Sequence, residues 1–141
     1  MIEQMSGQDP VGAIMSAAHR ILLVDDDPAI RSSLTFALEL EGFAVETFET
    51  GEALAARAAR ADDACLVLDY RLPGLDGLAA LALLRSRGIG LPAAIMTSNP
   101  TRNLRKAVDE AGAALIEKPL LCDALTRAIK SLIGGVPATP H

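Results

Sequence analysis

Five short apolar runs, separated by segments of helical spacing, constrain this fold more than any other feature of the sequence. Four of the runs are continuously apolar, which is typical of strands buried on both faces of a parallel sheet. The second run, from Phe43 to Phe48, alternates more and favours a strand at the edge of the sheet. The continuous runs cover residues 21–24, 65–68, 93–96 and 113–116.

Between these runs, apolar residues recur at spacings of three and four, which predicts helices with one buried face. Asp27 and Asp76 are expected to cap two of them, because an aspartate before a helix accepts hydrogen bonds from its first free N–H groups. The helices are expected to begin at Pro28, at about Gly51 and after Asp76, and then to cover about 104–111 and 125–132.

Alternation of strand and helix, repeated five times, predicts an α/β fold of (βα)5 type. Parallel connections cross over right-handedly, so we expect a doubly wound, five-stranded parallel sheet with helices on both faces. The 141 residues suffice for one domain, expected at 19–133 between a flexible leader at 1–18 and a disordered tail at 134–141. On the third helix, Arg85 and Arg87 are expected to face solvent.

Composition and charge exclude several classes of function. The net charge is −5 and aromatic residues make up 3% of the chain, which argues against direct binding of nucleic acid. No apolar run approaches the roughly 18 residues of a membrane span, and residues 1–18 lack the basic start of a signal peptide. Cys65 and Cys122 have no disulfide or zinc spacing. A cytoplasmic protein that binds no membrane is therefore expected.

Polar residues follow four of the five apolar runs. Asp25 to Asp27 follow the first run, Asp69 the third, Thr97 the fourth and Lys118 the fifth. The carboxyl ends of parallel strands meet at one edge of a sheet, where ligands of such folds bind. The sequence therefore predicts that these carboxylates, a hydroxyl group and an ammonium group converge on one site.

Charge favours a magnesium ion at this site. Asp25, Asp26 and Asp69 bring three negative charges, which one Mg²⁺ and the ammonium group of Lys118 would balance. Oxygen ligands favour a hard cation, and few protein ligands with remaining waters favour Mg²⁺ over Ca²⁺. The metal and the lysine could hold a phosphoryl group, with Thr97 donating a hydrogen bond and Asp69 acting as the nucleophile.

Several of these residues also have a simpler interpretation. Asp25 and Asp26 alone are typical of a turn, and Asp76 of a turn or cap. Glu117 and Lys118 could form an exposed ion pair, which contributes about 0–1 kcal/mol. The combination of acids, a hydroxyl group and a lysine at four strand ends favours the functional interpretation.

Four segments, in this order and separation, carry the motifs of a known family. They are Ile-Leu-Leu-Val-Asp-Asp-Asp at 21–27, Leu-Asp-Tyr-Arg-Leu-Pro-Gly-Leu-Asp-Gly at 68–77, Ile-Met-Thr-Ser at 95–98 and Glu-Lys-Pro-Leu at 117–120. Together they resemble the receiver domain of bacterial two-component response regulators. The similarity covers roughly residues 20–133 and implies the flavodoxin-like strand order 2-1-3-4-5.

The resemblance implies a role for each site residue. Asp69 would be the phosphoacceptor, and Lys118 and Thr97 would contact the phosphoryl group. The chain departs from the family at Leu115, where many receivers have Tyr or Phe, so we expect switching to be concentrated in residues 97–106. The implied Mg²⁺ ligands are Asp26, Asp69 and the backbone carbonyl of Arg71, with Asp25 acting through a metal-bound water.

The resemblance also implies partners. A sensor histidine kinase or a histidine phosphotransfer protein would donate the phosphoryl group. A downstream protein would bind the face made by the fourth helix, fifth strand and fifth helix, where Arg102, Arg105 and Lys106 form a basic group, and a homodimer is a further option. The domain would be a phosphoacceptor that can dephosphorylate itself, not an enzyme with a separate substrate.

Three alternatives remain. A pseudo-receiver would keep the fold and bind partners independently of phosphorylation. A Mg²⁺-dependent phosphatase with an aspartate nucleophile requires a second acid as proton donor, at the position where this chain has Arg71. A flavin mononucleotide carrier requires a Ser/Thr/Gly loop after the first strand. This chain instead has the acidic segment 25–27 there, which would repel the flavin phosphate.

Overall fold

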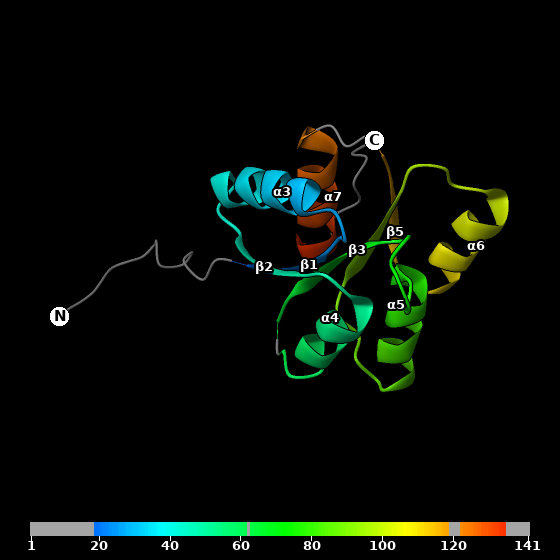
Figure 1. Ribbon diagram of the computed structural model, residues 1–141. Helices are drawn as coiled ribbons and strands as arrows, with labels where there is room; N and C mark the ends of the chain where they lie inside the picture. Colours follow the sequence, from blue (N-terminus) through cyan, green and yellow to red (C-terminus); the bar gives the residue numbers. More distant parts are fainter. Residues whose placement is uncertain (1–18, 62, 119–121, 135–141) are drawn as a thin grey trace.

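The computed structural model describes residues 19–61, 63–118 and 122–134 (Figure 1). All paired strands are parallel, and their order in the sheet is β2-β1-β3-β4-β5. The structure therefore confirms the predicted α/β fold, its strand order and the edge position of β2. The strands are β1 (Arg20–Val24), β2 (Ala44–Phe48), β3 (Cys65–Asp69), β4 (Ala93–Thr97) and β5 (Ala114–Glu117).

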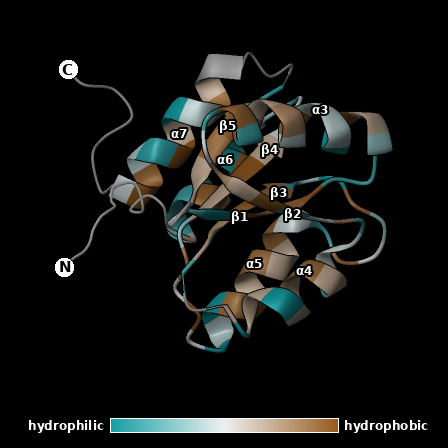
Figure 2. Ribbon diagram, turned by 90° about the vertical axis from the view of Figure 1, so that its left-hand side faces the viewer, coloured by the Kyte–Doolittle hydropathy of each residue, from teal (hydrophilic) through white to brown (hydrophobic). Residues whose placement is uncertain are grey.

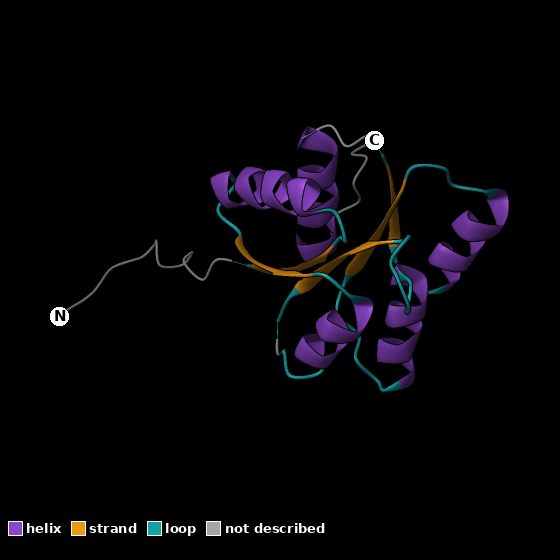
Figure 3. Cartoon of the chain, viewed as in Figure 1, coloured by secondary structure: helices purple, strands orange, loops and turns teal. Residues whose placement is uncertain are grey.

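A helix follows each strand, as the alternating colours of Figure 3 show. Helices α3 and α7 cover one face of the sheet, and α4 and α5 cover the other (Figure 1). The expected leader at 1–18 and residues 135–141 of the expected tail lie outside the described residues. The helices are α3 (Pro28–Leu40), α4 (Gly51–Ala58), α5 (Gly77–Ser86), α6 (Arg102–Glu110) and α7 (Cys122–Gly134).

Short polar side chains set the start of four helices. The Asp27 carboxylate accepts a hydrogen bond from the N–H of Ala29 at the start of α3, and Asp76 caps α5 in the same way. Both predicted aspartate caps are confirmed. Thr50 and Thr101 cap α4 and α6, because a threonine hydroxyl oxygen can accept the same kind of bond.

The sheet divides the core into two layers. On β1, Leu22 and Val24 belong to the core layer that includes residues of α4, α5 and α6, whereas Ile21 and Leu23 belong to the layer that includes residues of α3 and α7. These four side chains are fully buried, as is expected for a central strand whose successive residues face opposite sides. In Figure 2, hydrophobic colours accordingly run along the sheet and the inner sides of the helices.

The prediction that Arg85 faces solvent is wrong. Its guanidinium group is half-buried and donates hydrogen bonds to the carbonyl oxygens of Ile89 at 3.0 Å, Leu91 at 2.8 Å and Ala111 at 3.3 Å. These carbonyls lie in the connection from α5 to β4 and at the end of α6, where helix and sheet bonds do not reach them. Arg87 is exposed, as expected.

Two further observations concern the apolar parts of the chain. Cys65 is a free, buried cysteine, and burial raises the pKa of its thiol to about 12, so it stays protonated. Among the described residues, none of the helices combines the length and the apolar character that crossing a membrane requires.

Candidate functional site

The carboxyl ends of four strands bring the predicted site residues together. Asp25 follows β1, Asp69 ends β3, Thr97 ends β4 and Lys118 follows β5. They line one hollow of about 320 Å³ that is open to solvent. The remaining residues around it are Asp26, Asp27, Ile30, Arg71 and Ser98.

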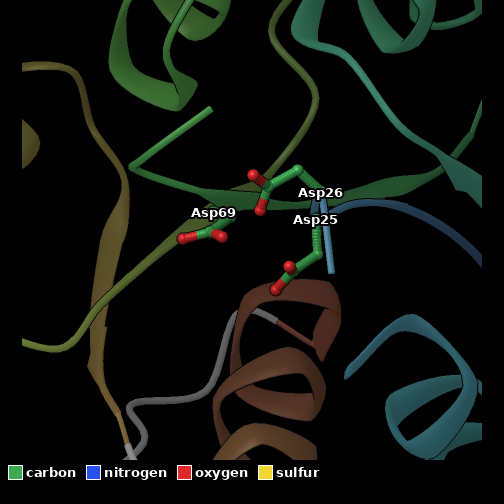
Figure 4. A group of neighbouring side chains, drawn as sticks. All are labelled: Asp25, Asp26 and Asp69. Carbon is green, nitrogen blue, oxygen red and sulfur yellow. The ribbon is translucent and has the colours of Figure 1, made fainter. Parts of the chain in front are cut away.

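Three carboxylates form the centre of the site. One oxygen atom each of Asp25, Asp26 and Asp69 lies within 4.8 Å of the others. Figure 4 shows the three side chains turned toward one another from two neighbouring strand ends. Asp25 and Asp69 are buried and Asp26 is exposed, so solvent screens their mutual repulsion only in part.

The acid–base behaviour of Asp69 reflects this crowding. Burial raises the pKa of its carboxyl group above the usual value, and the nearby charge of Asp25 raises this pKa further. The ammonium group of Lys118 and a hydrogen bond from the backbone N–H of Arg71 act in the opposite direction. An additional cation in the hollow would therefore favour ionised, nucleophilic Asp69.

Lys118 reaches into the cluster. Its Nζ atom lies 3.2 Å from Oδ1 of Asp69 and 3.4 Å from Oδ2 of Asp25. Its backbone N–H donates to the carbonyl oxygen of Thr97 at 2.8 Å, which fixes the residue beside β4. Glu117 instead lies 3.7 Å from Arg105 on α6, so the simpler interpretation of an exposed Glu117–Lys118 pair does not describe this site.

Asp25 is held in place by its own turn and by a residue that the sequence interpretation missed. Its Oδ1 atom accepts a hydrogen bond from the N–H of Asp27 at 2.9 Å. Its backbone carbonyl oxygen accepts one from Nη1 of Arg31 at 2.7 Å. Arg31 lies on the first turns of α3, and helical side chains point back toward the N-terminus of their helix. The position of Arg31 near the start of the predicted helix therefore indicated that its side chain could reach the residues just before the helix.

Thr97 is buried at the end of β4. Its hydroxyl oxygen lies 3.4 Å from the backbone N–H of Asn99, a long hydrogen bond that leaves the side chain weakly held. The hydroxyl therefore has hydrogen-bonding capacity left for another oxygen in the hollow. Leu115, on the neighbouring strand β5, is partly buried against the core layer of α4 to α6.

Gly77 lets α5 begin directly against Asp69. A Cβ atom at this position would clash with the backbone carbonyl oxygen of Asp69 and lie 3.2 Å from Cβ of Leu68. The N–H of Gly77 also donates to the carbonyl oxygen of Tyr70 at 3.1 Å. Glycine at this position thus allows the loop around Asp69 to pack closely against α5. This role could not be predicted from the sequence, where Gly77 indicates only a turn.

The donor set fits a hard divalent cation. Carboxylate oxygens come from Asp25, Asp26 and Asp69, and Arg71 lines the same hollow. Within the part of the chain that the structure describes, the cluster that could hold a metal ion contains no histidine or cysteine. Oxygen ligands at a site open to solvent suit Mg²⁺, which keeps several of its waters.

Comparison with known proteins agrees with this geometry. Residues 21–130 match the family described as "Response regulator receiver domain". The chain belongs to this family. It is 35% identical over 120 residues to the transcriptional regulatory protein FixJ of Bradyrhizobium diazoefficiens. That match covers 84% of this chain and 58% of FixJ, so the chain spans little more than half of this relative.

Two solved receiver domains have the same fold. A CheY-like receiver domain protein from Methanospirillum hungatei superimposes with a TM-score of 0.78 at 29% identity, covering 84% of this chain and 95% of that one. The receiver domain of the sensor histidine kinase PA1611 from Pseudomonas aeruginosa gives 0.73 at 28% identity, covering 83% and 98%. In the latter, a magnesium ion is coordinated in the active site cleft.

Proposed function

We propose that this receiver domain, residues 19–133, accepts a phosphoryl group on Asp69 in a Mg²⁺-dependent reaction. The donor is the phosphohistidine of a sensor histidine kinase or of a histidine phosphotransfer protein. The supporting observation is that one hollow contains the Asp69 carboxylate, two further carboxylates and the ammonium group of Lys118. A pseudo-receiver that ignores phosphate would have no use for this combination.

In the transfer, an oxygen atom of Asp69 attacks the phosphorus atom and forms an acyl phosphate. The bond between phosphorus and the histidine nitrogen breaks, and the imidazole leaves with its electron pair. Asp25, Asp26, Asp69 and the Arg71 carbonyl would hold Mg²⁺, which supplies positive charge to the phosphoryl oxygens. The domain is thus modified on its own side chain and has no separate substrate.

Lys118 and Thr97 complete the site. Lys118 loses part of its pairing with Asp69 when that carboxylate becomes an acyl phosphate, a mixed anhydride, and its ammonium group then pairs with a phosphoryl oxygen. Thr97 donates the hydrogen of its weakly held hydroxyl group to another phosphoryl oxygen. Both contacts stabilise charge that the transfer brings into the hollow.

The outer side of α3 offers the donor protein an apolar surface. Phe36 is 67% exposed and Leu40 is 71% exposed, which is unusual for large hydrophobic side chains. A groove of about 440 Å³ lies beside Phe36 between α3 and β2. Because α3 starts at the site, a protein seated here would bring its phosphohistidine near Asp69.

Output passes through protein contacts on the face made by α6, β5 and α7. Arg102, Arg105 and Lys106 are exposed on α6 and form a basic group suited to an acidic partner. A second copy of the chain could use the same face. We place the protein in the cytoplasm and assign it no direct contact with nucleic acid or membrane.

Mass spectrometry after incubation with Mg²⁺ and a small acyl phosphate tests the proposal. We expect one phosphoryl group per chain, located on Asp69, and none in Asp69→Asn or without Mg²⁺. Label on Asp25 or Asp26 in the native protein, or full labelling of Asp69→Asn, would contradict the assignment. Failure of the folded protein to bind beryllium fluoride with Mg²⁺ would favour the pseudo-receiver.

A further inference from the structure

We propose that Arg31 is a positioning residue of the site: its guanidinium group fixes the peptide unit between Asp25 and Asp26 and thereby sets the affinity of the carboxylate cluster for Mg²⁺. The inference rests on the proposed Mg²⁺-binding role of this cluster. It adds a residue that lies outside the cluster and contributes no ligand atom to it.

The contact itself is short and partly shielded from water. Nη1 of Arg31 donates to the backbone carbonyl oxygen of Asp25 at 2.7 Å, and the Arg31 side chain is 17% exposed. A charged donor makes this bond stronger than an ordinary amide–carbonyl bond. A further contact of the guanidinium group, 3.8 Å from the 79% exposed carboxylate of Glu49, contributes little.

The peptide held by Arg31 joins the buried and the exposed acid of the cluster. Residues 25–27 belong to neither a strand nor a helix, so regular backbone pairing does not fix their orientation. The N–H of Asp25 bonds to the carbonyl oxygen of Phe48, which anchors one side of the residue to β2. Arg31 anchors its carbonyl side, and that peptide plane decides the direction in which the Asp26 side chain leaves the backbone.

The orientation of the Asp26 carboxylate depends most on how firmly the backbone is held. Asp25 is also held through its carboxylate, by the N–H of Asp27 at 2.9 Å and by Lys118 at 3.4 Å. Asp26 is exposed, and its carboxylate must be kept beside two others that repel it. Residues that orient metal ligands typically change metal affinity by about 10- to 100-fold when removed.

The charge of Arg31 acts in the opposite direction to its positioning effect. A positive charge near the cluster repels Mg²⁺, so removal of Arg31 should tighten binding if charge alone mattered. Loss of positioning should weaken it. The sign of the change in Mg²⁺ affinity therefore separates the two effects.

Calorimetric titration of the metal-free protein with MgCl₂ measures that sign. Arg31→Met removes the charge and the donor at similar length, and Arg31→Lys keeps the charge and one donor. Lys130→Met is the matched control, since Lys130 is an exposed lysine on α7 whose Nζ lies 3.2 Å from a carboxylate oxygen of Glu41. Urea unfolding with EDTA shows that each variant is folded under the titration conditions.

We expect Arg31→Met to bind Mg²⁺ about 10-fold more weakly, Arg31→Lys to stay within about threefold of the native protein and Lys130→Met to be unchanged. Equal or tighter binding by Arg31→Met overturns the inference while leaving the proposed function intact. Equal weakening in Lys130→Met also overturns it. Absence of Mg²⁺ binding in the native protein overturns both proposals.

Discussion

Lys118 offers the sharpest test of the electrostatics of the site, because its ammonium group contacts two buried carboxylates at once. We expect Lys118→Met to destabilise the metal-free protein strongly at pH 7, and much less when Asp69 is already neutral. In the native chain, Nζ lies 3.2 Å from Asp69 and 3.4 Å from Asp25, whose side chains are 8% and 1% exposed. The substitution therefore leaves two buried negative charges close together without a cation.

The distances give the size of the effect. At an effective dielectric constant of about 20, unit charges 3.2 Å apart attract by about 5 kcal/mol before desolvation is counted. Removing one partner of a buried pair costs about 3–5 kcal/mol, and the 22% exposure of Lys118 places this case at the lower end. We expect a loss of about 3 kcal/mol for Lys118→Met alone and about 1 kcal/mol in the Asp69→Asn background. The coupling energy is then about 2 kcal/mol.

Urea unfolding with EDTA at pH 7, on the native protein, the two single variants and the double variant, measures this coupling. Asp69→Asn keeps the shape of the side chain, so the comparison isolates its charge. A coupling energy below about 0.5 kcal/mol would refute the reasoning, because Lys118 would then stabilise the fold independently of the Asp69 charge.

Four further results are expected. Mg²⁺ at a hundredfold excess over its dissociation constant should stabilise the protein by about 2.7 kcal/mol in thermal unfolding, and Asp26→Asn should reduce that response. Because the pKa of Asp69 is raised, the folded state binds more protons than the unfolded state at mildly acidic pH. The stability of the metal-free protein should therefore fall as pH rises through that range. In urea unfolding, Asp69→Asn should flatten this part of the pH profile. Gly77→Ala should cost about 2–3 kcal/mol in the same assay, whereas Gly90→Ala, where a Cβ meets nothing within 4 Å, should change stability by less than about 0.5 kcal/mol. Beryllium fluoride with Mg²⁺ should change hydrogen exchange mainly in residues 97–106; a change confined to β5 and α7 would show a different route.

Hydrophobic patterning accounts for the parts of the fold that could be predicted. The continuous run 65–68 is buried on both sides in β3, and the alternating run that begins at Phe43 is an edge strand, β2. Asp27 and Asp76 cap helices because their short side chains reach N–H groups two or three residues away. In each case the prediction depends only on residues that are close together in the sequence. The site followed from the rule that parallel strands end at a common edge.

Residues whose roles depend on distant backbone atoms could not be predicted in this way. Arg85 was expected in solvent, but its long side chain reaches a carbonyl oxygen 26 residues away at Ala111. Arg31 reaches back to Asp25, and Gly77 matters because the backbone of Asp69 lies against it. Periodicity shows which face of a helix is buried, but it does not show which carbonyl groups the fold leaves without partners.

The hydrogen bond from Arg85 anchors the C-terminal end of α6. The guanidinium group attaches Ala111, just beyond the last residue of α6, to the connection between α5 and β4. Thr101 caps the opposite end, four residues after Thr97. The 9 residues of α6 give an arm of about 13 Å, so a tilt of about 10° about Ala111 moves the Thr101 end by about 2 Å. If phosphorylation displaces the sheet edge at Thr97 as proposed, we expect the movement of α6 to be smallest at Ala111 and largest beside Thr101.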